Sequence, residues 1–322
     1  MGTLRACSVG TSPTVTRHCG VFGHPLSHSI SPVFQQSAFD ALGLDVIYEA
    51  WDVEPAHFPD RLAELRLPRY LGANVTIPHK VHALQLADVQ TPLASAIGAA
   101  NTLVMRHGRL EAHNTDVHGF LTSLTLDGQC DVLGSDAVIL GAGGAARAVA
   151  LALMLAGVQQ ITIANRNKAR AAMLAASMDG LAPTQVGELR AQVAGRVGIR
   201  PHQEHTPTLV VVPWDSDALR SALERANVIV NSTSLGMRGV QEGTTPLPPL
   251  TDLRPSTLLV DIVANPLETR LMREARQRGL RVVGGLPMLI YQGAASFAIW
   301  TGLEPPVARM FKAAHAYMEH MR

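Results

Sequence analysis

Residues 137–157, AVILGAGGAARAVALALMLAG, combine a short apolar run, a glycine-rich turn and a second, longer apolar run. The residues before Gly141 predict a buried strand, and the Ala- and Leu-rich run predicts a helix that Gly157 closes. The turn fits the pattern G-x-G-x-x-G/A, in which the first Gly permits a tight turn and the second lets the backbone approach a pyrophosphate. Because a strand precedes this motif and a helix follows it, we expect a dinucleotide at the turn.

The strand that follows, residues 160–164, indicates whether the dinucleotide is NAD or NADP. An NAD-binding protein usually has Asp or Glu at the end of this strand, about 20 residues further on, to bind the ribose 2′-hydroxyl. Here the strand ends in Asn165, Arg166, Asn167 and Lys168. No carboxylate is present to repel a 2′-phosphate, and the guanidinium of Arg166 can bind one bidentately. We therefore expect NADP; the alternative is that Arg166 and Lys168 only begin a solvated helix.

Strands alternate with helices along the chain, which predicts an α/β fold, and 322 residues suit two domains. Short apolar runs without alternation at 208–212, 228–230 and 258–262 favour a parallel sheet covered on both faces. An earlier α/β unit begins near Gly20, and Ser31 is expected to cap its first helix. The expected division is a loose extension at 1–19, a first domain at 20–115 that C-terminal helices at 285–322 rejoin, and a dinucleotide-binding domain at 116–284.

The composition excludes several classes of protein. Basic and acidic residues number 27 and 26, and this balance gives no electrostatic footprint for nucleic acid or an anionic membrane. No apolar run reaches the ~20 residues of a membrane span, and residues 1–19 do not form a secretory signal. Cys7, Cys19 and Cys130 are too few for a disulfide framework or a Cys-based zinc site, so a reducing cytoplasm is expected. The His202–His205 pair lies among prolines, and no metal site is expected.

Five polar clusters lie where loops should leave strands, at 28–32, 74–80, 98–102, 114–116 and 291–293. Ligands of open α/β sheets bind outside the carboxyl ends of the strands. Hydroxyls, amides, one Lys and one Asp suit a small, polyhydroxylated, anionic substrate. Each residue alone has a plainer interpretation: Ser31 as a helix cap, Asn101 as a turn residue and Lys80 as a solvated charge.

The clusters and the glycine turn together resemble the shikimate dehydrogenase family, which includes shikimate/quinate dehydrogenases. The matching segments, in order from about Gly20 to Gly302, are GHPLSHSISP (23–32), NVTIPHK (74–80), IGAANT (97–102), NTD (114–116), GAGGAARA (141–148), NR (165–166), NSTSLGM (231–237) and MLIYQGA (288–294). The resemblance implies an N-terminal α/β substrate-binding domain, a Rossmann NADP-binding domain and a cleft between them. The implied reaction is the reversible NADPH-dependent reduction of 3-dehydroshikimate to shikimate, in aromatic amino-acid biosynthesis.

The resemblance also implies roles for individual residues. Lys80 and Asp116 match the catalytic pair. The substrate-binding positions are Ser29 and Ser31, which bind the carboxylate, together with Thr76, Lys80, Asn101, Asp116 and Gln292. The expected cofactor-binding residues are Gly141, Ala142, Gly143, Gly144, Ala145, Asn165, Arg166, Lys168 and Gly285. The expected partner is a small-molecule substrate, without nucleic acid or membrane, and the expected state is a monomer or homodimer.

Three positions depart from the family pattern. Ala264 replaces a Tyr that lies near the substrate ring and the nicotinamide, Asn167 replaces Thr, and Val117 replaces Gly. Two alternatives stay open: a quinate/shikimate dehydrogenase with broader substrate or NAD use, and a weakly active ligand-binding paralogue. Retention of both Lys80 and Asp116 argues against the paralogue.

The Arg166 assignment predicts a cofactor-specific defect. Arg166→Ala should weaken NADP⁺ binding by about tenfold or more, because a hydrogen bond to a charged group contributes about 1.5–3 kcal/mol. NAD⁺ has no 2′-phosphate, so its dissociation constant should barely change. Titration of the variant with both cofactors checks this, and an equal loss for both would assign Arg166 to the fold or the pyrophosphate instead.

Overall fold

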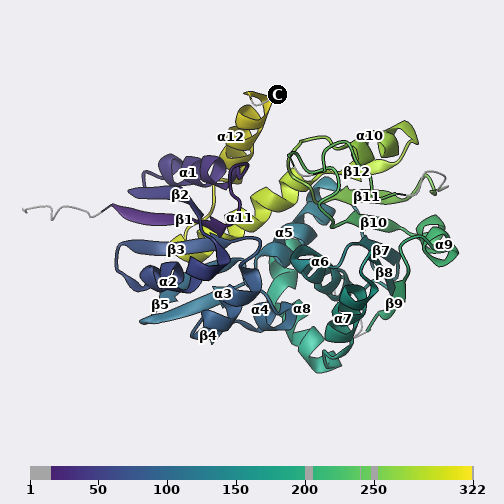
Figure 1. Ribbon diagram of the computed structural model, residues 1–322, viewed down its shortest axis with the longest axis horizontal. Coiled ribbons are helices and arrows are strands. Elements are labelled where there is room, and N and C mark those ends of the chain that lie inside the picture. Colours follow the sequence, from purple (N-terminus) through teal and green to yellow (C-terminus); the bar gives the residue numbers. More distant parts are fainter. Residues whose placement is uncertain (1–15, 200–205, 240, 248–252, 321–322) are drawn as a thin grey trace, which may run out of the picture.

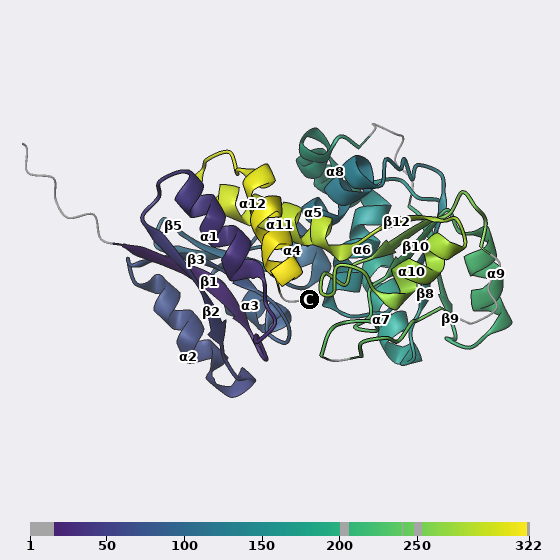
Figure 2. The same ribbon diagram turned by 90° about the horizontal axis from the view of Figure 1, so that it is seen from above.

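The computed structural model describes residues 16–199, 206–239, 241–247 and 253–320, and within them the chain forms two six-stranded sheets. The two sheets lie side by side, each with its own helices, as the purple-to-blue and teal-to-green halves of Figure 1 and Figure 2 show. We call the N-terminal sheet with its covering helices the first lobe and the other sheet with its helices the second lobe.

The second lobe is a parallel sheet in the order β12-β11-β10-β7-β8-β9. Its strands are β7 (Asp136–Leu140), β8 (Gln160–Ala164), β9 (Thr208–Val212), β10 (Val228–Asn231), β11 (Leu258–Asp261) and β12 (Arg281–Val283). Its helices are α6 (Gly144–Leu155), α7 (Lys168–Asp179), α8 (Pro183–Val197), α9 (Asp217–Arg225) and α10 (Arg270–Gln277). In chain order this is the 3-2-1-4-5-6 arrangement of dinucleotide-binding sheets. The strand order reverses between β7 and β10, where such sheets bind their ligand.

Helix α6 explains the most apolar run of the chain. Every residue from Ala148 to Leu155 is buried, because β7 packs on one side of the helix and α5 and α8 on the other. The run is therefore the central core helix of the second lobe. None of the helices in the described part of the chain is long and apolar enough to cross a membrane.

The first lobe has a mixed sheet in the order β2-β1-β3-β5-β6-β4. Its strands are β1 (Arg17–Gly23), β2 (Val46–Asp52), β3 (Tyr70–Val75), β4 (Val89–Gln90), β5 (Thr102–Arg106) and β6 (Arg109–His113). β1 is parallel to β2 and β3, whereas β5 is antiparallel to β3 and β6. The carboxyl ends of β1, β3 and β6 and the start of β5 therefore lie at one edge of the sheet.

Helices cover both faces of this sheet. One face packs on α1 (Ser31–Ala41), α11 (Gly285–Thr301) and α12 (Val307–His320), and the other on α2 (Phe58–Ala63), α3 (Lys80–Leu86) and α4 (Pro92–Ile97), with short 3₁₀ turns at Pro55–His57 and Glu64–Arg66. Phe39 and Phe297 meet in the first of these cores, with ring centroids 4.9 Å apart. The expected return of the C-terminal helices to the first lobe is thus confirmed; α12 packs against α1.

Helix α5 (Asp116–Thr122) and α11 join the lobes. α5 continues as a π-helical turn at Ser123–Asp127 and packs against both α11 and α6. A Cβ atom at Gly119 would lie 2.6 Å from the carbonyl oxygen of Met288, so α5 approaches α11 at a distance that only Gly allows. This close packing places Gln292 beside the first turn of α5.

Several local features differ from the sequence expectations. β1 begins at Arg17, so residues 17–19 of the expected loose extension belong to a strand; residues 1–15 lie outside the described part. Ser31 is the first helical residue of α1, not its cap: Ile30 holds the N-cap position, and no side chain caps the helix there. Neither α8 nor the antiparallel β5–β6 pair was expected. The latter depends on a turn at His107 and Gly108, both with positive φ.

The buried carboxyl of Asp261 ties β11 to β10 at their carboxyl ends. It accepts hydrogen bonds from Nδ2 of Asn231 (2.9 Å) and from the Thr269 hydroxyl (2.6 Å). Burial nevertheless raises the pKa of Asp261 from 3.8 to about 6. The folded chain therefore retains a proton that the unfolded chain loses above about pH 4, and stability should fall as the pH rises through this interval.

Asp261→Asn should remove this pH dependence. Relative to the natural chain, the variant should gain free energy of unfolding as the pH rises from about 4 to about 7, by roughly 3 kcal/mol. Denaturant unfolding of both proteins across this range measures the difference. A difference that does not change with pH would contradict the assigned ionisation.

Candidate active site

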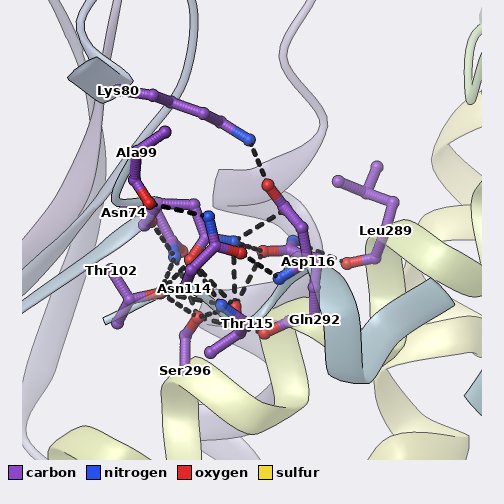
Figure 3. A network of polar contacts seen from close by, with 11 residues as sticks. Asn74, Lys80, Ala99, Thr102, Asn114, Thr115, Asp116, Leu289, Gln292 and Ser296 are labelled. Carbon is purple, nitrogen blue, oxygen red and sulfur yellow. Dashed lines mark hydrogen bonds and ion pairs between the residues drawn. The ribbon is translucent and has the colours of Figure 1, made fainter. Parts of the chain in front are cut away.

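The polar clusters gather at one edge of the first sheet because of its topology. The segment at 24–30 leaves β1, the segment at 76–79 leaves β3, and residues 114–116 leave β6. Asn101 directly precedes β5, which runs in the opposite direction. α11 crosses behind this edge and contributes Gln292. Segments far apart in the sequence thus meet around one small region (Figure 3).

Lys80 and Asp116 form an ion pair at this edge. Lys80 begins α3 and Asp116 begins α5, and Nζ of Lys80 lies 2.5 Å from Oδ2 of Asp116. The two side chains are 19% and 7% exposed, so the pair is partly shielded from water yet still reachable. Figure 3 shows the ammonium group approaching the carboxylate from the opposite side to the other polar side chains. One oxygen of the carboxylate thus contacts the amine of Lys80, while the other points into the protein interior.

The carboxamide of Asn101 holds that second oxygen. Its Nδ2 lies 2.8 Å from Oδ1 of Asp116 and 3.1 Å from Oε1 of Gln292. Its Oδ1 accepts a hydrogen bond from the backbone N–H of Thr115 (2.8 Å). Gln292 in turn donates from Nε2 to the carbonyl oxygen of Leu289 (2.7 Å). The structure therefore brings four of the expected site residues into one network: Lys80, Asp116, Asn101 and Gln292.

A layer of hydroxyl and amide groups supports this network. Its members, all buried, are Asn74, Thr102, Thr115 and Ser296. Three of its members belong to the polar clusters found in the sequence, but their supporting role was not predicted, and Ser296 lies outside those clusters. The Ser296 hydroxyl lies 2.7 Å from that of Thr102 and 3.1 Å from that of Thr115, and Nδ2 of Asn74 donates to it (3.0 Å). Ser296 follows Gln292 by one helical turn and donates to its carbonyl oxygen. For Ser296, this four-residue spacing from Gln292 was the signal that the sequence offered.

His79 anchors the backbone next to Lys80. Its ring is buried, stacks on Phe58 at 4.2 Å, and donates from Nε2 to the carbonyl oxygen of Val53 (2.7 Å). Burial lowers the pKa of His79, in keeping with a neutral imidazole. The start of α3, and with it Lys80, is therefore fixed to the end of β2.

Ser29 and Thr76, on loops, and Ser31, at the start of α1, lie at the same edge but outside this network. Within the described residues, no hydrogen bond engages the side-chain hydroxyl of any of the three. Ser29 and Thr76 are half-buried, and Ser31 does not cap α1. Their hydroxyls are thus free to donate to a ligand, as the expected roles of Ser29 and Ser31 at a substrate carboxylate and of Thr76 at the substrate require.

The glycine turn after β7 fits a pyrophosphate. Gly141 has φ +113°, and a Cβ there would lie 2.8 Å from Oγ of Ser232, so this position requires Gly. A Cβ at Gly143 or Gly144 would meet nothing within 4 Å, which leaves the backbone open to a ligand. α6 begins here without a side-chain cap, so its first N–H groups remain available to phosphate oxygens. Ala142 and Ala145 are half-buried beside the turn.

The end of β8 fits a phosphorylated ribose. Arg166 and Lys168 are exposed, and neither has an ion pair within the described ranges. Asn165 donates to the carbonyl oxygen of Asn167 (2.8 Å), and Oδ1 of Asn167 caps α7 by accepting from the backbone of Arg170 (3.1 Å). Asn167 therefore caps α7, a role for which Asn ranks at least as high as the Thr expected there.

Gly285 and Ala264 lie near the ends of β11 and β12. Gly285 is buried as the first residue of α11, and a Cβ there would lie 2.5 Å from the backbone of Ile262 and Val263. Packing alone thus requires Gly at 285. Ala264 is half-buried in the loop after β11 and carries no functional group. Val117, the remaining departure, is buried in the core that α5 shares with α6.

No group of three or more His, Cys, Asp or Glu side chains within the described ranges is arranged to hold a metal ion. The His202–His205 pair lies outside those ranges.

Comparison with known proteins agrees with this geometry. Models of the shikimate dehydrogenase substrate binding domain, of shikimate/quinate 5-dehydrogenase and of the shikimate 5′-dehydrogenase C-terminal domain match residues 21–103, 127–195 and 285–315. The shikimate dehydrogenase (NADP(+)) of Moorella thermoacetica is 44% identical over 290 residues, 90% of each chain.

Two solved structures have a similar fold. Shikimate 5-dehydrogenase of Thermus thermophilus, in complex with NADP(H) and shikimate, is 37% identical, with a TM-score of 0.75 over 93% of this chain and 99% of that one. Quinate dehydrogenase of Corynebacterium glutamicum, in complex with NAD, is 28% identical, with a TM-score of 0.77 over 94% of this chain and 99% of that one. Both the motifs and the arrangement of the lobes place this chain in the shikimate dehydrogenase family.

Proposed function

We propose that this chain is an NADP-dependent shikimate dehydrogenase, which reduces 3-dehydroshikimate to shikimate and oxidises shikimate in reverse, in aromatic amino-acid biosynthesis. The observation that carries this proposal is the shielded Lys80–Asp116 pair, with its Nζ–Oδ2 distance of 2.5 Å, at the edge where the polar loops converge. Its amide neighbours Asn101 and Gln292 supply oriented donors and acceptors for a hydroxylated ring.

In the proposed reaction Lys80 transfers the proton. NADPH, when bound, supplies the hydride to the carbonyl carbon of the substrate. The ammonium of Lys80 donates a proton to the carbonyl oxygen as negative charge develops there. One C–H and one O–H bond form while the π bond of the carbonyl breaks, and the C–O single bond remains. In the oxidative direction neutral Lys80 removes the hydroxyl proton. Asp116 orients the amine and accepts a hydrogen bond from the substrate, while Ser29 and Ser31 donate to its carboxylate.

The cofactor is proposed to lie along the second lobe. The turn formed by Gly141, Ala142, Gly143, Gly144 and Ala145 would hold its pyrophosphate, and Asn165, Arg166 and Lys168 its phosphorylated ribose. The substrate domain is proposed to comprise residues 20–115 and 285–322, and the NADP domain residues 116–284. Free thiols at Cys19 and Cys130 suit a cytoplasmic enzyme, acting as a monomer or homodimer.

A quinate/shikimate dehydrogenase is the second candidate. The TM-scores of 0.77 and 0.75 show that the backbone resembles the quinate dehydrogenase as closely as the shikimate enzyme. The choice therefore depends on side chains, and Arg166 at the end of β8 favours NADP.

Initial rates of cofactor reduction should distinguish the candidates. With the purified protein, shikimate and NADP⁺ should give the highest kcat/KM, and quinate or NAD⁺ should each lower it by about tenfold or more. Equal rates with quinate and NAD⁺ would favour the second candidate. Tight NADP⁺ binding without turnover of either substrate would favour a ligand-binding paralogue and contradict both.

Lys80→Ala should lower kcat far more than it raises KM, because a proton donor acts mainly in the transition state. Asp116→Asn should impair the same step. The double variant should therefore be much less impaired than the product of the single effects predicts. Steady-state kinetics of all four proteins measure this coupling, and multiplicative effects would show that the two residues do not act as a unit.

A further inference from the structure

A contact between the two lobes lies outside the network described above. It joins the loop after β1, which carries Ser29, to the loop after β10 in the second lobe. A Cβ atom added to Gly239 would lie 3.1 Å from Nε2 of His28 and 3.5 Å from its Cδ2. The imidazole edge therefore rests directly on the Gly239 backbone. Both residues are exposed, which places the contact at the outer rim of the two loops.

The first-lobe loop is held in place from within its own lobe. The Asp52 carboxylate, at the end of β2, accepts a hydrogen bond from the backbone N–H of Leu26 (3.0 Å) and lies 2.6 Å from Nδ1 of His24. Ser29 donates from its backbone to the Leu26 carbonyl (2.9 Å). His28 thus lies in a turn that hydrogen bonds hold in place, immediately before Ser29, which is proposed to bind the substrate carboxylate.

Backbone hydrogen bonds also hold the second-lobe loop in place. Gly236 donates from its backbone to the Gln241 carbonyl (2.9 Å), and Arg238 donates to the Asn265 carbonyl (3.0 Å). Gly239 itself has φ +73°, a conformation that favours Gly. Each loop is thus held by hydrogen bonds within its own lobe, so a displacement of one lobe relative to the other would change the contact between His28 and Gly239.

We propose that His28 is a positioning residue, whose contact with Gly239 fixes the Ser29 loop relative to the cofactor-side loop. The contact sets how far the group that binds the substrate carboxylate stands from the lobe that carries the cofactor. Its effect on turnover rests on the proposed function, whereas the contact itself does not.

The test pairs Gly239→Ala with a matched control in the same loop. Gly243 has φ +77°, but a Cβ there would meet nothing within 4 Å. Gly243→Ala therefore imposes similar backbone strain without touching the other lobe. Because the methyl group at 239 displaces the imidazole, hydrogen exchange of residues 24–31 should accelerate in Gly239→Ala and not in Gly243→Ala. In a His28→Ala background the substitution at 239 should have no further effect on that segment.

Kinetics supply the functional readout. Gly239→Ala and His28→Ala should each raise the KM for shikimate about three- to tenfold, with NADP⁺ affinity within about twofold of the natural chain, because small misplacements of binding groups weaken productive binding. The double variant should match His28→Ala alone. Unchanged exchange of residues 24–31 in Gly239→Ala, or the same loss with and without His28, would overturn the inference. Failure of the natural chain to oxidise shikimate would instead overturn the proposed function and leave the exchange test intact.

Discussion

The buried carboxamide of Asn101 is the interaction on which the rest of the site depends. It donates toward Asp116 and Gln292 and accepts from the backbone of Thr115, so it connects the start of β5 with α5 and α11. Rotation of this amide would leave buried polar groups without partners, at a cost of about 1–3 kcal/mol for each. Asp116 therefore has one oxygen fixed by the interior and one left to Lys80. Because the two carboxylate oxygens have different partners, the Asp116 carboxylate is held in one orientation toward the amine of Lys80.

The two sheets divide the work of binding between them. In the proposed enzyme, the parallel sheet presents a backbone turn and a helix start to the cofactor phosphates, a task that needs no reactive side chain. The mixed sheet presents side chains, because its antiparallel β5 brings the residue before a strand to the same edge as residues that follow strands. α5 and α11 pack against each other and join the lobes, so Asp116 and Gln292 lie on the elements most sensitive to how the lobes meet.

The sequence predicted those parts of the molecule that depend on local chemistry. The strand–turn–helix at 137–157 and the C-terminal return are present, and Lys80, Asp116, Asn101 and Gln292 meet at one edge of the first sheet. The expectation that every polar cluster leaves a strand was wrong for two of them, because Gln292 lies within α11 and Asn101 precedes β5. Contacts between segments that are far apart in the chain could not be predicted from the sequence. Thr102, Thr115 and Ser296 are ordinary hydroxyl residues until the sheet and α11 bring them together. Ser31 also looked like a helix cap, because Pro32 suits the first turn equally well whether the helix begins one residue earlier or later.

The proposed mechanism requires one orientation of the substrate relative to Lys80, Asp116 and Asn101. A crystal structure of the chain with shikimate and NADP⁺ tests it most directly. The account predicts that the reacting hydroxyl contacts both Nζ of Lys80 and the carboxylate of Asp116, that the substrate carboxylate accepts from Ser29 and Ser31, and that Asn101 keeps its bond to Asp116. Shikimate bound with its carboxylate at Lys80, or away from this edge of the first sheet, would contradict it.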